Sequence, residues 1–218
     1  SMRSIAHITN KQNETEDIIR RQANYDHLTQ LPNRLLSFKS CEQSLERAAR
    51  NQSQVAILFI DLDDFKKVND TLGHDAGDEV LIEAASRLKR LIRGGDTIGR
   101  FGGDEFIVAI EQITDESDSA YIAEQLISEL EKSFKIDDRE LLLSASIGIS
   151  IYPKDGTTTA ELLRKADSAM YHAKDSGYSS YSFFAESMNK VTTRRLAIEE
   201  QLHGAIKRNE LDVFFQPV

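Results

Sequence analysis

The segment VAILFI, residues 55–60, constrains the fold of this chain most, because it is apolar at every position and runs directly into Asp61-Leu62-Asp63-Asp64. A strand with one face in water alternates apolar and polar residues, whereas a strand covered on both faces reads as a continuous apolar run. Residues 55–60 are therefore predicted to form a central strand of a sheet, with carboxylates where that strand ends.

Helix-like and strand-like patterns follow one another in mixed order along the rest of the chain. Apolar periodicity predicts helices over residues 35–50, 65–72, 78–93, 117–134 and 160–174, and Gly73 and Gly77 are expected to separate the second from the third. Further strands are expected over residues 97–101, 106–110, 141–152 and 181–184, the first two forming a hairpin around Gly-Gly-Asp-Glu. This order predicts an α+β fold with a largely antiparallel central sheet flanked by helices.

The composition of the chain limits which class of partner it can bind and in which cellular compartment it is expected. The chain has 218 residues, a formal net charge of −9 and one cysteine, Cys41. The acidic balance argues against a non-specific nucleic-acid partner, but free nucleotides remain possible because a metal ion can link acids to phosphates. One cysteine excludes an internal disulfide and favours a reducing compartment, so we expect a cytoplasmic location. No apolar run approaches the length of a membrane span, although a longer protein containing this chain could still be membrane-tethered.

Acidic side chains stand at two strand ends that the predicted sheet can bring together. Asp61 follows the central strand, and Asp104 and Glu105 occupy the hairpin tip. Carboxylates that converge repel one another, more strongly when they are buried, and a divalent cation removes this conflict. Oxygen ligands at strand ends suit Mg²⁺ (or Mn²⁺), which accepts substrate phosphates as further ligands. Two such ions about 4 Å apart can activate a hydroxyl and stabilise charge on a phosphoryl group.

The glycines of the tip fit the same interpretation, because Gly102 and Gly103 lack a Cβ and allow a ligand to approach the main chain. Each feature alone also has a purely structural interpretation: an acidic, Gly-containing turn is a good hairpin turn, and the acids after residue 60 can form a solvated turn or a helix cap. Together with Asn69 and Asp78 downstream, these two acidic segments provide four polar positions that would line one cleft. Asn is both donor and acceptor whereas Asp only accepts, and this combination matches a guanine edge.

Five segments, in this order along the chain, together resemble the GGDEF domains, the bacterial diguanylate cyclases. The segments are DHLTQLPNR (26–34), DLDDFKKVNDTLGHDAGDEVL (61–81), GRFGGDEF (99–106), SIGISIYPKDG (146–156) and ADSAMYHAK (166–174). The resemblance covers about residues 25–184 and implies a fold of the nucleotide-cyclase and polymerase-palm type. It also implies a reaction in which two GTP condense to cyclic di-GMP and two pyrophosphates, with one GTP per domain and two domains facing each other in a homodimer.

The resemblance implies a role for each polar position of this site. Asp61 and Asp104 match the Mg²⁺ ligands, assisted by the Leu62 carbonyl. Glu105 matches the acid nearest the attacking 3′-hydroxyl, a candidate general base. The positions that match substrate-binding residues are Asn69 and Asp78 for guanine, Phe65, Lys66 and Lys174 for the phosphates, and Gly102 and Gly103 where ligand meets main chain.

A second site is suggested by the sequence RGGD, residues 93–96. Arg93 and Asp96 stand at the offset from the hairpin where members of the family often bind dimeric product and are inhibited by it. An arginine can contact the O6/N7 edge of guanine with two donors. The alternative interpretation is a helix end, with the two glycines as C-cap and Asp96 beginning a turn.

Two positions depart from the family pattern. Tyr178 stands where an arginine usually helps to hold phosphate, and Gln30 replaces a usual glycine. A hydrogen bond to a charged group contributes roughly 1.5–3 kcal/mol, so weaker GTP binding is expected unless another basic residue compensates. The alternative function is therefore a weakly active or inactive GTP/cyclic di-GMP-binding module that regulates a following phosphodiesterase domain.

The expected domain organisation has three parts. Residues 1–24, which include AHITNKQ, resemble the tail of a PAS sensor domain running into a connecting helix, and residues 25–185 form the GGDEF domain. Residues 186–218 form a linker helix and a strand that resemble the opening of an EAL phosphodiesterase domain. The catalytic acids of that domain are absent from the sequence, so this chain is not expected to hydrolyse cyclic di-GMP.

Overall fold

The computed structural model describes residues 21–136 and 138–188. The chain divides into two compact units, Ser1–Phe184 and Ala185–Val218, and all helices and strands named below belong to the first. Most of residues 1–24 and 186–218, where a connecting helix, a linker helix and a last strand are expected, lie outside the described residues.

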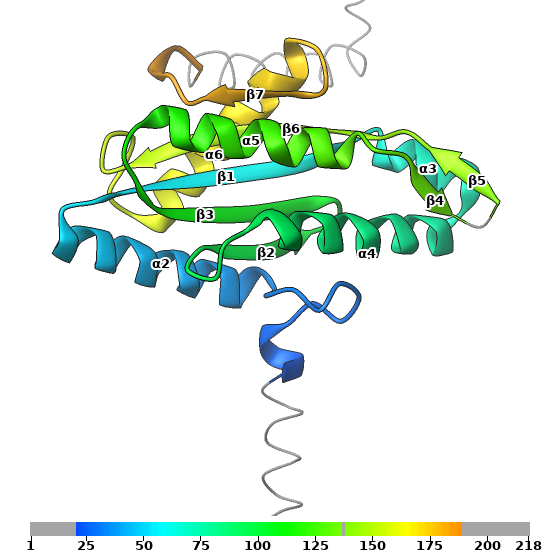
Figure 1. Ribbon diagram of the computed structural model, residues 1–218, viewed down its shortest axis with the longest axis horizontal. Coiled ribbons are helices and arrows are strands. Elements are labelled where there is room, and N and C mark those ends of the chain that lie inside the picture. The colour runs from blue at the N-terminus through cyan, green and yellow to red at the C-terminus, as the bar shows by residue number, and fades with distance from the viewer. Residues whose placement is uncertain (1–20, 137, 189–218) are drawn as a thin grey trace, which may run out of the picture. The chain divides into compact units, whose positions relative to one another are not determined.

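Five strands form one sheet in the order β2-β3-β1-β6-β7, which Figure 1 shows from bottom to top. β1 lies at the centre and runs antiparallel to both neighbours, β3 and β6, whereas the edge strand β7 runs parallel to β6. The strands are β1 (Gln54–Asp63), β2 (Thr97–Gly102), β3 (Glu105–Ile113), β6 (Ser144–Tyr152) and β7 (Ser180–Phe183). The predicted central strand, hairpin and α+β class with a largely antiparallel sheet are confirmed.

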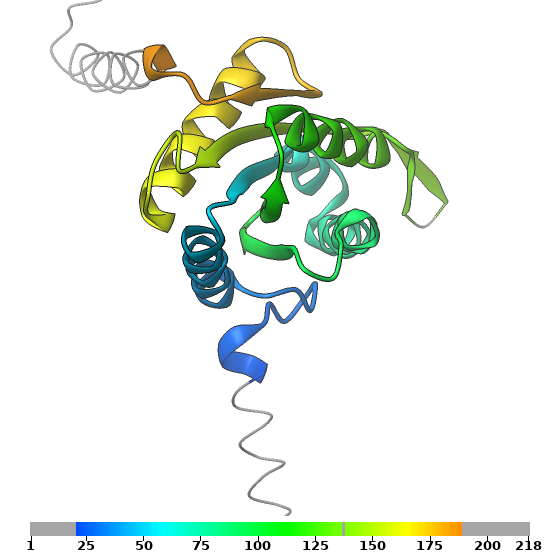
Figure 2. The same ribbon diagram turned by 60° about the vertical axis from the view of Figure 1, so that its left-hand side comes forward.

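Helices cover both faces of the sheet, as Figure 2 shows. Alternate residues of β1 point to opposite faces: Leu58 packs with side chains of α4 and α5, and Ile57 with those of α2 and α6. The helices are α2 (Arg34–Asn51), α3 (Phe65–Leu72), α4 (His74–Leu91), α5 (Glu116–Leu130) and α6 (Thr159–Asp175). Both faces of β1 are therefore buried, which explains its unbroken apolar sequence.

The position of α6 on the sheet is fixed by one glycine and by a capped start. A Cβ on Gly148 of β6 would lie 1.9 Å from the Ala166 carbonyl oxygen, so this strand and this helix meet backbone to backbone. The helix begins after Thr158, whose side chain accepts a hydrogen bond from the Glu161 N–H. As a result, the register of α6 over the strands, and with it the side chains near its C-terminal end, is closely defined.

The helix expected from residue 78 begins earlier, at His74, and runs through Gly77, so only Gly73 interrupts the helical segments. Gly73 has a φ of +90°, which favours glycine, but Gly77 is helical. A Cβ on Gly77 would lie 2.0 Å from the Asn69 side-chain oxygen, which explains this glycine. The glycine that was expected to break a helix instead makes room for a neighbouring side chain.

The helix expected over 117–134 ends at Leu130, and the long strand expected over 141–152 is in fact two elements. Phe134–Ile136 (β4) and Arg139–Leu141 (β5) form a separate two-stranded hairpin, and β6 begins only at Ser144. The end of α5 depends on a residue that is distant in the sequence. Arg87 of α4 donates hydrogen bonds to the carbonyls of Glu129, Lys132 and Ser133, and these bonds stabilise the chain where it leaves the helix. No helix of the described residues is both long and apolar enough to cross a membrane.

Candidate functional site

The acids that the sequence places at two strand ends lie side by side in the sheet. Asp61 of β1 and Glu105 of β3 are paired across the two antiparallel strands. The Leu62 N–H donates a hydrogen bond of 3.3 Å to the Asp104 carbonyl oxygen, which joins the hairpin tip to the end of β1. The structure therefore brings Asp61, Asp104 and Glu105 together at one end of the central strands.

The pleat of β1 decides which helix these acids meet. Asp61 has the same parity as Ile57, so it points to the face covered by α6. There Lys174 Nζ donates a hydrogen bond of 2.6 Å to Asp61 Oδ1, and only 7% of Asp61 remains exposed. The resemblance gave Lys174 a phosphate-binding role, and the structure adds a direct contact with a carboxylate.

The electrostatics of this cluster show an excess of negative charge. Burial, followed by the charges of Asp104 and Asp63, raises the pKa of Asp61 to about 6, although the hydrogen bond from Lys174 opposes the shift. Burial and the charges of Asp61, Asp167 on α6 and Asp104 likewise raise the pKa of Glu105. Lys174 is desolvated, yet its bond to Asp61 raises its own pKa. A single ammonium thus faces several carboxylates, an arrangement that further cations stabilise.

The donor atoms at this end of the sheet fit a divalent cation shared with a phosphate ligand. Among residues 21–136 and 138–188, no group of three or more His, Cys, Asp or Glu side chains is arranged to hold a metal ion by itself. Mg²⁺ is usually held by one or two carboxylates together with waters and substrate phosphates. Asp61 and Asp104, with the backbone carbonyl of Leu62 near the end of β1, match such an incomplete set.

The hairpin tip is held by a network that the sequence analysis missed. Arg100 donates from Nε and Nη2 to the Gly103 carbonyl at 2.9 and 2.7 Å, and from Nη1 to both carboxylate oxygens of Asp26 at 3.0 and 3.2 Å. Although burial opposes it, hydrogen bonds from Thr29 and Arg100 lower the pKa of Asp26, so its charge persists. The available sequence signal was Arg100, three residues before Gly103. Its acidic partner Asp26 is 74 positions away in the sequence, so the pair could not be recognised from local pattern.

The two glycines of the tip have different roles. Gly103 has a φ of +51°, a left-handed conformation that favours glycine, whereas Gly102 does not. A Cβ at either position would meet no atom within 4 Å, so the space beside the tip is open. The structure thus leaves room for the predicted ligand approach at both, and adds a conformational requirement at Gly103.

The predicted guanine and phosphate positions lie on α3 and α4. Asn69 is half-buried on α3 against Gly77, and Asp78, the next residue of α4, is exposed. The side chain of Phe65 is buried in the core, so a ligand can reach this residue only through its backbone. Lys66 is exposed in the first turn of α3, whose N-cap residue Asp64 makes no side-chain cap. The start of α3 therefore offers N–H groups to an anion.

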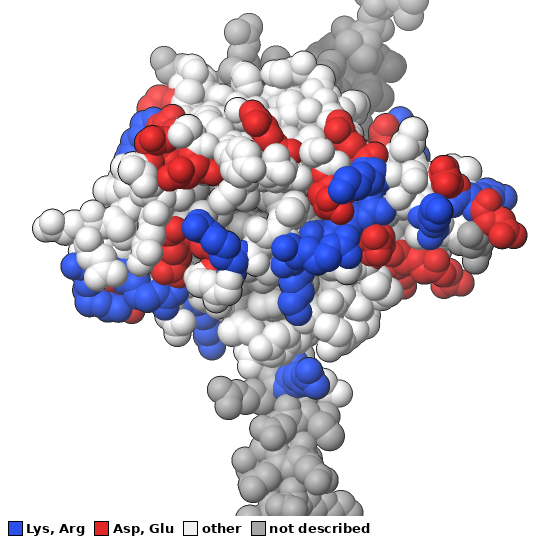
Figure 3. All heavy atoms as spheres, in the orientation of Figure 1, with Lys and Arg blue, Asp and Glu red and all other residues white. Residues whose placement is uncertain are grey.

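The predicted product-binding pair lies apart from the acidic cluster, at the end of α4. Arg93 Nε and Asp96 Oδ2 are 3.3 Å apart, and Asp96 Oδ1 accepts from the Glu111 N–H at 2.9 Å. The Asp96 side chain is 5% exposed and that of Arg93 is 68% exposed. Figure 3 shows Lys and Arg side chains gathered near the middle of one face of the molecule. Arg90, in the last turn of α4, lies 3.4 Å from Glu129. The helix-end interpretation is wrong: α4 ends at Leu91 with Ile92 as its C-cap, and Gly94 and Gly95 lie in a turn that the Asp96 N–H closes on the Arg93 carbonyl. Asp96 supports the hairpin, and Arg93 is accessible for a ligand.

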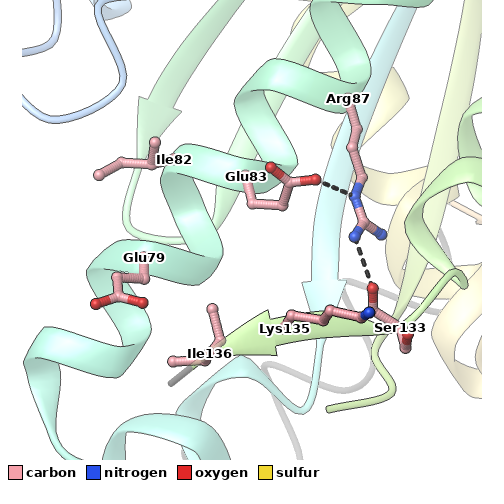
Figure 4. A pocket seen from close by; sticks show the side chains of 7 residues that line it. All are labelled: Glu79, Ile82, Glu83, Arg87, Ser133, Lys135 and Ile136. Atoms are coloured by element: carbon pink, nitrogen blue, oxygen red, sulfur yellow. Dashed lines mark hydrogen bonds and ion pairs between the residues drawn. The ribbon is translucent and has the colours of Figure 1, made fainter. Parts of the chain in front are cut away.

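A hollow of about 450 Å³ between α4 and β4 contains none of the predicted site residues (Figure 4). The buried Arg87 lies along its wall and is fully engaged, with Glu83 on Nε at 2.8 Å and the Phe134 ring at 4.0 Å from the guanidinium carbon. The other residues that line this hollow are acidic, basic, polar and aliphatic: Glu79, Ile82, Ser133, Lys135 and Ile136. Its arginine has a structural role, tying α4 to the turn before β4.

Comparison with known proteins identifies the family. Residues 23–180 match the family model described as "Diguanylate cyclase, GGDEF domain". The chain is 45% identical over 193 residues to the bifunctional diguanylate cyclase/cyclic di-GMP phosphodiesterase MucR of Pseudomonas aeruginosa, covering 88% of this chain and 28% of MucR. It is 34% identical over 200 residues to the cyclic di-GMP phosphodiesterase NbdA of the same organism, covering 92% of this chain and 25% of NbdA. The chain thus spans about a quarter of the length of these relatives.

A solved structure gives the same result for the fold. The GGDEF domain of TpbB (YfiN) from Pseudomonas aeruginosa superposes with a TM-score of 0.75 at 36% sequence identity, covering 78% of this chain and 99% of that one. The residues that match the family model contain β1, β2, β3 and β6 and the acidic cluster at the end of β1 and β3. This chain belongs to the GGDEF domain family of diguanylate cyclases.

Proposed function

We propose that this domain is a Mg²⁺-dependent diguanylate cyclase that binds one GTP and acts as a facing homodimer. The observation that carries the proposal is the convergence of Asp61, Asp104 and Glu105 at the end of a buried strand, next to Lys174. Such a site has more negative charge than its own lysine balances, and it opens beside a glycine turn that leaves room for a ligand. Triphosphate with its metal ions has the complementary composition.

Each side chain then has a definite task. Asn69 and Asp78 recognise guanine, while Lys174, Lys66 and the backbone at the start of α3 hold the phosphates. Asp61, Asp104 and the Leu62 carbonyl would hold Mg²⁺ (or Mn²⁺), which supplies charge neutralisation at the phosphoryl group and lowers the pKa of the attacking hydroxyl. Glu105 has a raised pKa, which makes it a better proton acceptor than an ordinary carboxylate.

The bond changes fix the stoichiometry and the need for two copies. The 3′-oxygen of one GTP bonds to the α-phosphorus of the other, its proton passes to a base, and the bond to pyrophosphate breaks. Two such steps join the nucleotides in a ring and release two pyrophosphates. One hairpin tip positions one GTP, so the catalytic gain comes from placing two domains opposite each other.

Two further parts of the proposal concern regulation. Arg93 and Asp96 form a product-inhibition site for cyclic di-GMP, supported by the accessible guanidinium of Arg93. The domain spans residues 25–185, with a sensor-linked helix over 1–24 and the beginning of an EAL domain over 186–218, in a cytoplasmic part of a longer protein. The much greater length of MucR and NbdA supports a multidomain parent protein.

A regulatory GTP-binding module is the second candidate. The observation that favours it is Tyr178, which is 57% exposed and stands where the family pattern has a phosphate-binding arginine. The name of NbdA, which mentions phosphodiesterase activity alone, also supports it. In this alternative the domain binds GTP or cyclic di-GMP and controls a following phosphodiesterase.

Product formation from GTP and Mg²⁺ at several protein concentrations separates the two candidates. A cyclase yields cyclic di-GMP, with a rate that rises faster than linearly with protein concentration while dimerisation is limiting. Fusion to a dimerising coiled coil removes that limit. GTP binding without product in this enforced dimer would overturn the cyclase and support the regulatory module.

A further inference from the structure

Asp63 is a buried carboxylate for which neither the predicted metal site nor the predicted substrate site has a use. It lies two residues after Asp61 on the same face of β1 and is 3% exposed. Its Oδ1 accepts from the Ser146 hydroxyl at 2.7 Å, and its Oδ2 accepts from the Ser144 hydroxyl at 2.7 Å and from the Ser179 backbone N–H at 3.1 Å. Three donors satisfy a charge that would otherwise be costly to bury.

The third of these donors belongs to a different part of the molecule from the other two. Ser144 and Ser146 are on β6, the strand that pairs with β1, whereas Ser179 follows α6. Residues 176–179 connect α6 to the edge strand β7 and include two left-handed residues, Gly177 at φ +112° and Ser179 at φ +62°. Asp63 therefore ties this connection to the end of the central strand.

The connection in turn holds the last turn of α6. The Gly177 N–H donates to the Lys174 carbonyl at 3.2 Å, and the Ser180 hydroxyl donates to the Ala173 carbonyl at 3.1 Å. A helix end has carbonyls without intrahelical partners, and these bonds satisfy two of them. Lys174 is in this last turn, and its ammonium contacts Asp61. Two hydrogen bonds, joined by the chain segment 177–179, thus connect Asp63 to the backbone of Lys174.

We propose that Asp63 is a positioning residue for the phosphates of the bound nucleotide. By fixing Ser179 it keeps residues 176–179 packed against the end of α6, so that Lys174 stays at the acidic cluster. This inference rests on the proposed function for its ligand, a nucleoside triphosphate. The contact between Asp63 and the connection stands on the geometry alone.

The chemistry of the three bonds predicts which substitutions matter. Asp63→Ala removes both acceptor oxygens. Asp63→Asn keeps one oxygen for Ser144 and Ser179, and the Ser146 hydroxyl can rotate to accept from the new amide. We therefore expect Asp63→Asn to restore what Asp63→Ala loses. The matched control is the double variant Ser144→Ala/Ser146→Ala, which removes the two hydroxyl donors and leaves the Asp63–Ser179 bond.

The composition of the chain provides a local reporter. The sequence contains no tryptophan, so Tyr178→Trp introduces a single tryptophan between Gly177 and Ser179, which can be excited at wavelengths where the remaining tyrosines do not absorb. Its fluorescence anisotropy measures the mobility of the connection without any nucleotide. Binding of 3′-deoxy-GTP with Mg²⁺ is then measured by calorimetry in the same variants, since this nucleotide lacks the attacking hydroxyl and cannot react. All comparisons are made at the same interval below each melting temperature.

In Asp63→Ala we expect lower anisotropy of the introduced tryptophan and about tenfold weaker binding of 3′-deoxy-GTP. Asp63→Asn and the serine double variant should remain within about twofold of the parent in affinity and keep its anisotropy. If Asp63→Ala does not fold, Asp63→Ser replaces it, because its hydroxyl keeps a polar group at this buried position while its shorter side chain is withdrawn from the Ser179 N–H. Anisotropy and affinity in Asp63→Ala that equal those of the parent would overturn the inference. A loss of affinity in Ser144→Ala/Ser146→Ala as large as that in Asp63→Ala would also overturn it. Failure of the parent to bind the nucleotide overturns the proposed function, while the anisotropy still tests the contact.

Discussion

Lys174, one residue before the end of α6, donates a hydrogen bond of 2.6 Å to Asp61 at the end of β1. The contact joins the helix on one face of the sheet to the strand at its centre. It also places a permanent positive charge beside a carboxylate whose pKa is raised to about 6 by burial and by Asp104 and Asp63. The predictions below follow from this partly balanced site.

Turnover is expected to fall as the pH decreases through about 6, because protonated Asp61 cannot bind a metal ion. Mg²⁺ should move the midpoint to lower pH, since it binds only the carboxylate. The effect on folding has the opposite sign: Asp61 keeps its proton to higher pH when folded, so its stabilising contribution is full below the ordinary pKa of 3.8 and is lost as the pH rises through about 6. Carbon NMR titration of Asp61 with and without Mg²⁺ measures both midpoints. A titration midpoint of Asp61 near pH 4 that does not change when Mg²⁺ is added would contradict the role of Asp61 as a metal ligand.

Asp104→Asn is expected to reduce metal-dependent turnover by at least about a hundredfold, because it removes a charged side chain that we propose as a ligand of the metal. The fold should persist, since Asp104 contacts β1 through its carbonyl oxygen and not its side chain. Asp138→Asn, an exposed substitution in the turn between β4 and β5, is the matched control. Rates as a function of Mg²⁺ concentration provide the measurement, and turnover retained at low Mg²⁺ would show that Asp104 is not a ligand.

Alanine substitutions at the two turn glycines should distinguish a requirement for a left-handed backbone from a requirement for close approach of the ligand. Gly103→Ala should destabilise the fold by about 1–2 kcal/mol because its φ is +51°. Gly102→Ala should leave the melting temperature unchanged, because its Cβ would meet no atom within 4 Å, and should weaken GTP binding if the ligand touches this backbone. Thermal unfolding and calorimetric binding on both variants test this contrast. Equal melting temperatures for the two variants would contradict the conformational argument.

Arg100→Ala is expected to lower the turnover rate by about ten- to a hundredfold, because the Gly103 carbonyl loses both hydrogen bonds that hold the tip. Asp26→Asn should have a smaller effect, and the double variant should resemble Arg100→Ala alone, since Asp26 acts through Arg100. Turnover rates of the four members of this cycle give the coupling energy. Additive effects would show that the two residues act independently.

Arg93→Ala should relieve inhibition by cyclic di-GMP and leave the uninhibited rate unchanged. Asp96→Ala is a poorer test, because Asp96 is nearly buried and accepts from the Glu111 N–H, so its loss also weakens the hairpin. Initial rates across a range of added product measure the inhibition constant. Inhibition of Arg93→Ala equal to that of the parent would remove RGGD from the inhibitory site.

The parts of the fold that the sequence predicts are those with local or periodic signals. Residues 55–60 are apolar at every position, and β1 lies at the centre of the sheet. Two strands flank Gly-Gly-Asp-Glu, and β2 and β3 form that hairpin. Adjacency of β1 and β3 then brings Asp61 opposite Glu105, as expected if the two strands were neighbours.

The parts that could not be predicted depend on contacts between residues far apart in sequence. The end of α5 is determined by Arg87, more than 40 positions away, and no local pattern at residues 131–134 reveals it. Gly77 has the residue type of a helix breaker but is required by the Asn69 side chain. Asp63 finds its third donor 116 positions along the chain. Periodicity describes one element at a time and does not contain such pairs.

The two faces of β1 have a consequence for how this domain tolerates change. Every residue from Val55 to Ile60 is apolar, so a shift of the strand by one position would still leave apolar side chains in both layers of the core, although of different sizes. The same shift would carry Asp61 from the side of Lys174 to the side of α4 and α5. Deletion of one residue within this strand would therefore still allow the domain to bury an apolar core. It would, however, place Asp61 on the face of the sheet away from Lys174.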